Sequence, residues 1–252
     1  MITVTDAQLA AWLGAVFWPL TRVLALFAAA PLLSHRAIPT RMKVALALAI
    51  TAVLAPTLSV PPLPAVLTGE GLALLAYNVL VGLTIGFAVR IVLAAFDLAG
   101  ELIGLQMGLS FAGFFNPASG SSQNPVGGFL ALLALLTFVA IDGHLMLLHA
   151  LLASFEAFPL TGRLAPLDLP ALLRLGADLF ALALSIALPF VAVLLLINVV
   201  LGVLARIAPQ LNVFAVGFPL TLLAGMTLLL VLLPYLQAPL LATLERALLP
   251  WR

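Results

Sequence analysis

The sequence predicts an all-α integral membrane protein, and three observations support this prediction. Hydrophobic residues make up 65% of the 252 residues and charged residues only 8%, whereas a soluble domain carries about 25% charged residues. The apolar residues form about six long runs, separated by short polar or proline-rich connections. No run alternates for long enough to resemble a membrane β-strand. We therefore expect a single membrane domain over residues 1–252, built from about six long hydrophobic helices arranged as helical hairpins.

The composition also narrows the possible functions. A net charge of +1 gives no reason to expect a nucleic-acid partner. The absence of cysteine excludes disulfides, thiolate metal sites and cysteine nucleophiles, and three histidines are too few for a histidine-rich metal site. We expect no cofactor and no metal. Residues 1–8 contain no lysine or arginine, so we expect the first apolar segment to be a retained helix rather than a signal peptide.

The first apolar segment runs from Leu9 to Leu33 and contains Arg22. In such a segment an arginine usually snorkels or pairs inside a helix bundle. The connection that follows holds the densest basic cluster, which makes it the best cytoplasmic candidate: Arg36, Arg41 and Lys43. The second segment, Val44–Ser59, is barely long enough to span a membrane.

The next two segments carry charged residues. Gly71–Leu98 contains Arg90 and Asp97, seven residues apart and so on one helix face. Gly127–Leu152 contains Asp142, Gly143 and His144. An acid and a histidine could perform acid–base chemistry, but at positions i and i+2 of one helix they point about 160° apart. A helix cap or a polar contact is the simpler interpretation of Asp142.

The C-terminal part, residues 172–252, is predicted to be a helical hairpin region. The fifth segment, Leu172–Leu204, is expected to kink at Pro189. The sixth is Val213–Leu233, and Leu240–Leu249 is predicted to be a short amphipathic helix. Basic residues orient the chain only weakly, because an external N-terminus would also place the basic tail outside.

The longest interruption of the apolar pattern is Gly100–Gly128. Its first part, Gly100–Gly113, can form a helix with a glycine face at every fourth residue. Such a face, like Gly82 and Gly86, permits close packing either within the chain or against other subunits. Irregular backbone cannot face lipid, so the stretch lies outside the membrane, is buried in protein, or lines a water-filled path. It is either an ordinary loop or a re-entrant element that obstructs a conduit.

Several motifs taken together resemble the FliR family of flagellar biosynthetic proteins, which belongs to the type III secretion export gate. The first half of the chain supplies Arg22 with Ala30-Pro31, Ile38-Pro39 before Arg41-Met42-Lys43, and Gly100-Glu101 before the run from Gly104 to Leu109. The second half supplies Asn116-Pro117, Asp142-Gly143-His144, Ser154-Phe155 before Pro159, Leu201-Gly202 to Arg206, the run from Ala208 to Phe214, and Gly217-Phe218-Pro219. The run from Ala208 to Phe214 favours flagellar over virulence-type use.

The resemblance implies a non-enzymatic core subunit of a protein-export channel in the bacterial inner membrane, at the flagellar basal body. Its partners would be FliP-like and FliQ-like membrane subunits, an FlhB-like export-switch protein, membrane lipid and unfolded secreted proteins. In similar proteins the stretch that matches residues 100–128 acts as a pore plug. The residues that it implies for gating are Gly104, Gln106, Met107, Gly108, Phe111, Phe114, Phe115, Asn116 and Pro117.

A second set of polar residues would be costly if it faced lipid, and the resemblance implies that these residues are buried or pair between subunits: Arg22, Arg90, Glu101, Asp142, His144, Arg206, Gln210 and Asn212. Without the resemblance, two other functions remain. A small-solute transporter could use buried charges and broken helices, and an intramembrane enzyme could use Asp142 and His144. The sequence has no HExxH, GxSxG or nucleotide-binding motif.

Overall fold

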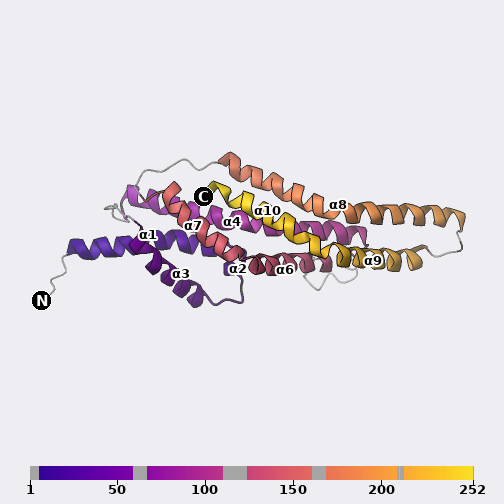
Figure 1. The fold of residues 1–252 in the computed structure, drawn as a ribbon, viewed down its shortest axis with the longest axis horizontal. Coiled ribbons are helices and arrows are strands. Elements are labelled where there is room, and N and C mark those ends of the chain that lie inside the picture. The colour runs from indigo at the N-terminus through magenta and orange to yellow at the C-terminus, as the bar shows by residue number, and fades with distance from the viewer. Residues whose placement is uncertain are drawn as a thin grey trace. The chain divides into compact units, whose positions relative to one another are not determined.

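The computed structural model describes residues 6–58, 67–109, 124–160, 169–208, 210 and 213–251, and all regular elements within these ranges are helical (Figure 1). The α-helices are α1 (Asp6–Ala29), α2 (Pro31–Ser34), α3 (Thr40–Leu54), α4 (Gly69–Gln106), α6 (Pro125–Ala140), α7 (Gly143–Ala157), α8 (Leu169–Ile207), α9 (Val213–Leu232) and α10 (Gln237–Leu248). Short 3₁₀ turns follow α3, α9 and α10: η1 (Ala55–Thr57), η3 (Leu233–Leu236) and η4 (Leu249–Trp251).

The predicted fold class is confirmed: the protein is an all-α integral membrane protein. Four helical stretches among the described residues are long and apolar enough to cross a membrane, namely Thr40–Thr57, Gly69–Gln106, Leu173–Ile207 and Ala215–Leu248. The pair α6 and α7 makes a fifth if it is taken as one broken span. The expected number of about six is therefore approximate, and the first segment contributes only the shorter apolar stretch Gly14–Ala29.

Proline sets the end of the first helix. The prediction of one helix over Leu9–Leu33 is wrong in this detail, because α1 stops at Ala29 and a separate turn, α2, begins at Pro31. Ala30 adopts φ −66° and ψ 128°, since a residue that precedes proline is pushed out of the helical region. Pro31 then occupies the first position of α2, where its missing N–H costs no hydrogen bond.

The third helix is longer than predicted. α4 has 38 residues and continues past Leu98 to Gln106. It therefore includes the first part of the helix that was expected over Gly100–Gly113, and the remainder of that expectation is wrong at Met107–Leu109, which form a turn. Gly100 and Gly104 thus lie on the last turns of α4, whereas Gly108 lies beyond its end.

The fourth predicted segment is broken at Ile141–Asp142. Asp142 adopts the left-handed conformation, with φ 58° and ψ 30°, which L-residues other than Asn, Asp and Gly rarely adopt. Its carbonyl oxygen accepts from the backbone N–H of Leu145 at 2.8 Å and of Met146 at 3.2 Å, so α7 starts immediately after it. Asp142 and His144 therefore do not share one helix as assumed. Asp142 occupies the cap position, but its side chain makes no capping hydrogen bond.

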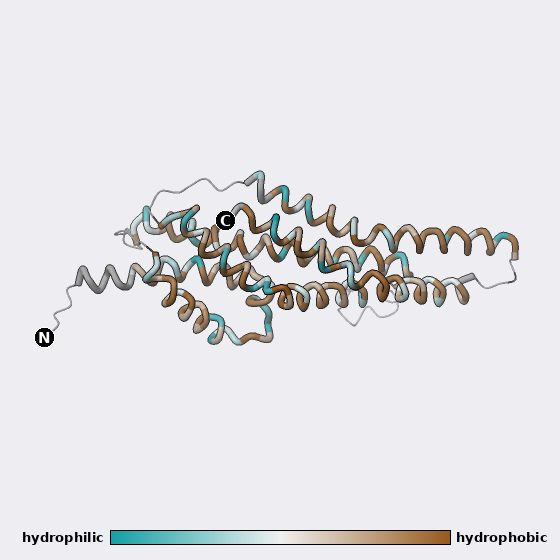
Figure 2. Tube along the Cα trace, viewed as in Figure 1, coloured by the Kyte–Doolittle hydropathy of each residue, from teal (hydrophilic) through white to brown (hydrophobic). Residues whose placement is uncertain are grey.

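The C-terminal helices follow the prediction closely. α8 runs through Pro189 without a break, and α9 ends within one residue of the expected position. The amphipathic tail helix is confirmed as α10, which buries residues at helical spacing on one side: Leu240, Thr243, Leu244, Ala247 and Leu248. Figure 2 shows hydrophobic residues continuing along the lengths of α8 and α9.

The chain divides into two compact units. Unit 1 consists of residues 1–90, 142–175 and 244–252, and unit 2 consists of residues 91–141 and 176–243. Within unit 1, α1 packs against α3 and against the first half of α4. Within unit 2, the second half of α4 packs against the start of α6 and against α9. The candidate functional residues therefore fall into two separate groups.

Candidate functional site

The first group lies in unit 2, where α4 ends in a Schellman motif. The N–H of Gly108 donates to the carbonyl oxygen of Leu105 at 3.1 Å, and the N–H of Leu109 donates to that of Gly104 at 3.0 Å. Gly108 has φ 79°, a conformation in which glycine avoids the strain that a Cβ would cause. The Gly104–Leu109 run is therefore a helix-ending signal.

Met107 is buried where this motif meets α9. Its side chain is fully buried and fills the space left by Gly225, since a Cβ on Gly225 would lie 2.6 Å from the Met107 Sδ. The Thr221 hydroxyl lies 3.4 Å from the Met107 carbonyl oxygen, and it lies closer to two carbonyl oxygens of its own helix, those of Gly217 at 3.1 Å and Phe218 at 3.0 Å. The ring of Phe218 lies beside Gly108. The end of α4 thus packs on α9 at a glycine.

The start of α6 is attached to the same part of α4. Asn124 is the N-cap, and its Oδ1 accepts from the N–H of Val126 at 3.0 Å. Its own backbone N–H donates to Glu101 Oε1 at 3.0 Å. The Asn124 side chain lies directly over Gly104, which has no room for a Cβ, and a Cβ on Gly100 would meet the backbone of Gly127.

Two carboxylates lie beside the first turn of α6. A Cβ on Gly127 would lie 2.9 Å from Glu101 Oε1 and 3.1 Å from Asp97 Oδ1. Unpaired N–H groups make a helix N-terminus partly positive, so negative charge there is stabilising. Asn124 Nδ2 is buried, and no hydrogen-bond partner for it lies within the described part of the chain. Glu101 thus combines a direct hydrogen bond with a favourable interaction with the helix dipole.

The second group lies in unit 1 and centres on Arg22, whose side chain is fully buried. Its Nε donates to Asn78 Oδ1 of α4 at 3.0 Å. Its Nη1 donates to the carbonyl oxygen of Ser154 at 2.7 Å and to Ser154 Oγ at 3.2 Å, and its Nη2 donates to the carbonyl oxygen of Phe158 at 2.7 Å. These acceptors are all neutral. Arg22 thus makes its hydrogen bonds to polar oxygens of other helices within the chain.

Two further features stabilise the charge of Arg22. Ser154 and Phe158 lie at the C-terminal end of α7, where unpaired carbonyl groups favour a cation. The face of the Phe155 ring lies 4.2 Å from the guanidinium Cζ, which adds a cation–π contact. Close packing brings α1 to α4, because Gly82 and Gly86 directly contact the α1 backbone. For these two glycines, packing within the chain is the interpretation that the structure supports.

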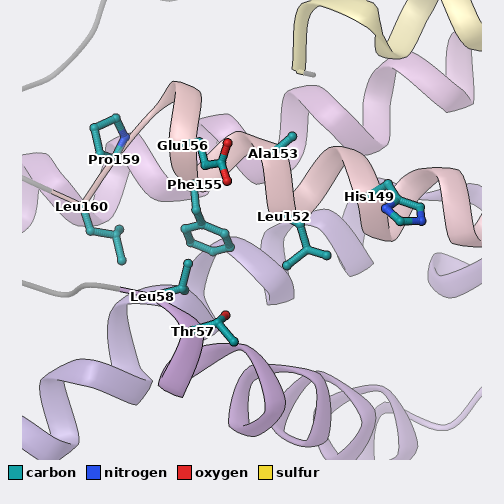
Figure 3. Close-up of a pocket in the computed structure, with 9 residues that line it drawn as sticks. All are labelled: Thr57, Leu58, His149, Leu152, Ala153, Phe155, Glu156, Pro159 and Leu160. Carbon is teal, nitrogen blue, oxygen red and sulfur yellow. The ribbon is translucent and has the colours of Figure 1, made fainter.

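A cavity of about 620 Å³ lies beside this junction in unit 1. Its lining comes from η1, α7 and the residues that follow them: Thr57, Leu58, His149, Leu152, Ala153, Phe155, Glu156, Pro159 and Leu160. Figure 3 shows the Phe155 ring pointing toward Leu58 and Thr57, while the Glu156 carboxylate points away from it and His149 lies at the far end. The two titratable side chains do not converge on a common point in the cavity.

The structure places the predicted residues unevenly. Gly104, Gln106, Met107 and Gly108 gather at the end of α4, while Phe111, Phe114, Phe115, Asn116 and Pro117 lie outside the described residues, as does Asn212. Of the predicted polar set, Arg22 alone among the described members is fully buried, and Glu101 and His144 are half-buried. The remaining four are exposed on the single chain: Arg90, Asp142, Arg206 and Gln210.

Sequence reasoning missed three residues of these groups. Asn78 is a lone amide in an apolar helix, a pattern that could have identified a partner for Arg22. Asn124 precedes Pro125, which is a typical start signal for a helix. Gly225 gave no signal, because only the packing of Met107 makes it necessary. In the part of the chain that the structure describes, no three histidine, aspartate or glutamate side chains are placed to hold a metal ion.

These features define a class: an α-helical integral membrane protein whose apolar helices are joined by a buried arginine junction and a glycine-packed helix end. The family model of bacterial export proteins, family 1, matches residues 13–247. Flagellar biosynthetic protein FliR of Escherichia coli (strain K12) is 44% identical over 237 residues, which cover 93% of this chain and 90% of that protein.

Flagellar biosynthetic proteins FliR of other bacteria match as well. The protein from Caulobacter vibrioides is 35% identical over 82% of this chain and 84% of its own length. The protein from Bacillus subtilis (strain 168) is 33% identical, with 83% and 82% covered. The chain therefore belongs to the FliR family of bacterial export proteins. The family resemblance predicted from the motifs is confirmed.

Proposed function

We propose that this protein is a core subunit of the flagellar type III export gate. In this proposal it joins FliP-like and FliQ-like subunits in a channel that passes unfolded flagellar proteins across the inner membrane, at the flagellar basal body. An FlhB-like export-switch protein contacts the assembly. Membership of the FliR family supports a role in flagellar export and a location in the membrane. The protein acts without catalysing a reaction, and energy for export comes from other components.

The length of the apolar helices is the observation that best supports the proposed assembly. α4 and α8 contain 38 and 39 residues, which corresponds to about 57–59 Å of helix, whereas the hydrocarbon core of a bilayer is about 30 Å thick. Only 33% of the residues in an 18-residue apolar window within Leu173–Ile207 are buried within the chain. Tilting of the helices reduces the difference between their length and the thickness of the hydrocarbon core, but does not remove it. Partner subunits that cover part of this apolar surface would account for the excess length, which supports the proposed assembly.

The exposed polar residues support the same proposal. Arg90 lies within α4 and Arg206 in the last turn of α8, and both are exposed on the single chain. An arginine that faces hydrocarbon is costly, so contact with a partner subunit or with a water-filled pore gives each a favourable environment. The residues near Arg206 on α8 include exposed, large apolar side chains, such as Val203 and Ile207.

Copurification tests the assembly. The affinity-tagged protein, extracted from flagellated cells in mild detergent, is expected to carry FliP-like and FliQ-like proteins through size-exclusion chromatography. A matched preparation that lacks the FliP-like protein should yield the chain without the complex. If the wild-type protein elutes without any partner and still moves a radiolabelled small solute in liposomes, the channel proposal falls and the transporter alternative replaces it.

We extend the proposal to residues 100–128 as an obstruction of the pore. The structure describes the beginning of this stretch, which includes Gly104, Gln106, Met107 and Gly108. Met107 packs on Gly225 without strong polar bonds. Such packing can separate at low cost, because methionine adapts its shape. Deletion of about ten residues over 107–115 is expected to make the assembled complex conduct ions at rest. Unchanged resting conductance in a complex of normal composition would contradict the plug.

A further inference from the structure

One turn of α4 holds the chain on both sides of residues 110–123. On one side, the Gly104 carbonyl oxygen accepts from the N–H of Leu109 at 3.0 Å. On the other side, Glu101 Oε1 accepts from the N–H of Asn124 at 3.0 Å, and the Asn124 side chain covers Gly104. Glu101 and Gly104 are three residues apart and so share one helix face. Both attachments therefore depend on the same turn, Glu101–Gly104.

We infer that Glu101 is a positioning residue for export, which fixes the start of α6 against this turn of α4. Glu101 supplies the side-chain contact that connects the two helices by a charge-assisted hydrogen bond, the stronger kind of protein hydrogen bond. The Schellman motif on the other side is made by backbone groups and needs no side chain. The inference deepens the proposed function and rests on it for its consequence in export, but its structural part stands independently.

The surroundings explain why a hydrogen-bond acceptor occupies this position. Asn124 caps α6, because its Oδ1 accepts a hydrogen bond from the backbone N–H of Val126. The backbone N–H of Asn124 itself is then free to donate to another acceptor. Gly104 and Gly100 lie opposite the start of α6, and their lack of side chains lets α6 approach α4. Asp97, one turn earlier on α4, lies at the same helix start. A neutral acceptor at position 101 can still make the hydrogen bond, whereas an alanine cannot.

The test compares Glu101→Ala with Glu101→Gln in the tagged, full-length protein purified together with whatever copurifies. Hydrogen–deuterium exchange is measured at the amides of Asn124 and Gly128. Glu101→Ala is expected to speed their exchange by about ten- to a hundredfold, whereas Glu101→Gln stays close to the wild type because it retains an acceptor. Glu70→Ala is the matched control, since Glu70 is an exposed carboxylate in the first turn of the same helix.

Secretion of flagellar proteins into the medium provides the functional measurement. Glu101→Ala is expected to change the secreted amount severalfold at normal membrane abundance, with Glu101→Gln restoring it. Unchanged amide exchange in Glu101→Ala overturns the positioning role, whatever the channel does. Altered exchange with unaltered secretion overturns its relevance to export. If the wild-type protein copurifies with no other subunit, only the proposed assembly is refuted. The exchange comparison still tests the positioning role, because it concerns a contact within the chain.

Discussion

The guanidinium of Arg22 donates from Nη2 to the carbonyl oxygen of Phe158 over 2.7 Å, across 136 residues of sequence. The contact joins α1 to the C-terminal end of α7. It replaces a helix-ending cap, because the carbonyl groups of a last helical turn have no partner within their own helix. The same guanidinium also reaches α4 through Asn78. Arg22 therefore determines how three helices of unit 1 meet.

Removal of this side chain should be among the most destabilising single changes in unit 1. Arg22→Ala leaves buried acceptors unsatisfied at Asn78, Ser154 and Phe158, so we expect a loss of about 3–5 kcal/mol in the free energy of unfolding. Arg22→Lys keeps the charge but cannot reach all acceptors with one ammonium, so we expect a loss of about 1–3 kcal/mol. Unfolding of the purified protein in mixed micelles measures both. Arg90→Ala, at an exposed arginine of α4, should stay within about 0.5 kcal/mol.

The close approach of α1 and α4 depends on Gly82 and Gly86. A Cβ on Gly86 would lie 2.7 Å from Ala29 Cβ, and one on Gly82 would meet the carbonyl oxygen of Arg22. Because backbone atoms cannot move aside as a flexible side chain does, each alanine substitution should cost about 1–3 kcal/mol. Gly202→Ala is the control, since a Cβ there meets open space. It should raise helix stability by up to about 1 kcal/mol, and equal losses at all three sites would contradict the packing argument.

The end of α4 depends on the backbone conformation of Gly108. With φ at 79°, Gly108→Ala should lower the free energy of unfolding by about 1–2 kcal/mol. Gly108→Asn should lose less, because asparagine tolerates the left-handed region. Thermal unfolding of the purified protein compares the two with Gly128→Ala, which introduces a Cβ into open space in α6. Equal stability of the alanine and asparagine variants would show that conformation does not limit this position.

The Asp142–His144 pair is expected to be dispensable for chemistry. Asp142 is exposed and lies before α7, and His144 lies within the first turn of α7. Asp142→Asn and His144→Ala should therefore leave secretion of flagellar proteins intact at normal protein abundance. Asp142→Val tests the structural role, since a β-branched residue at φ 58° is strongly disfavoured. Loss of secretion by Asp142→Asn, with the protein stable and assembled, would revive the enzyme alternative.

Hydrophobic runs are sufficient to predict where the helices lie, because a membrane chain must satisfy its backbone groups within helices. The positions at which the helices end are harder to predict from the local sequence. Pro31 explains the end of α1 from sequence alone, whereas the break at Asp142 needs a left-handed residue that no local pattern requires. Gly108 lies in a position typical of a helix end, yet the apolar pattern favoured a longer helix.

The partners of the polar residues were harder to predict than the residues themselves. Arg22 stood out as a charge in an apolar run, but its acceptors are an amide, a hydroxyl and two carbonyl groups in distant segments. Every residue carries a carbonyl group, so no sequence pattern distinguishes the ones at Ser154 and Phe158. The resemblance implied a gating role for Met107, and its side chain is fully buried against Gly225, a contact that depends on tertiary packing.

The distance along the chain between Arg22 and Ser154 has a consequence for biosynthesis. The two residues are 132 positions apart, and chains are synthesised at about 5–20 residues per second. The arginine therefore emerges from the ribosome about 7–26 s before the carbonyl group that will accept its Nη1 proton. During that interval the guanidinium lacks the acceptors that Ser154 and Phe158 will supply. Correct placement of α1 must then be completed after α7 has been made, rather than in order of synthesis.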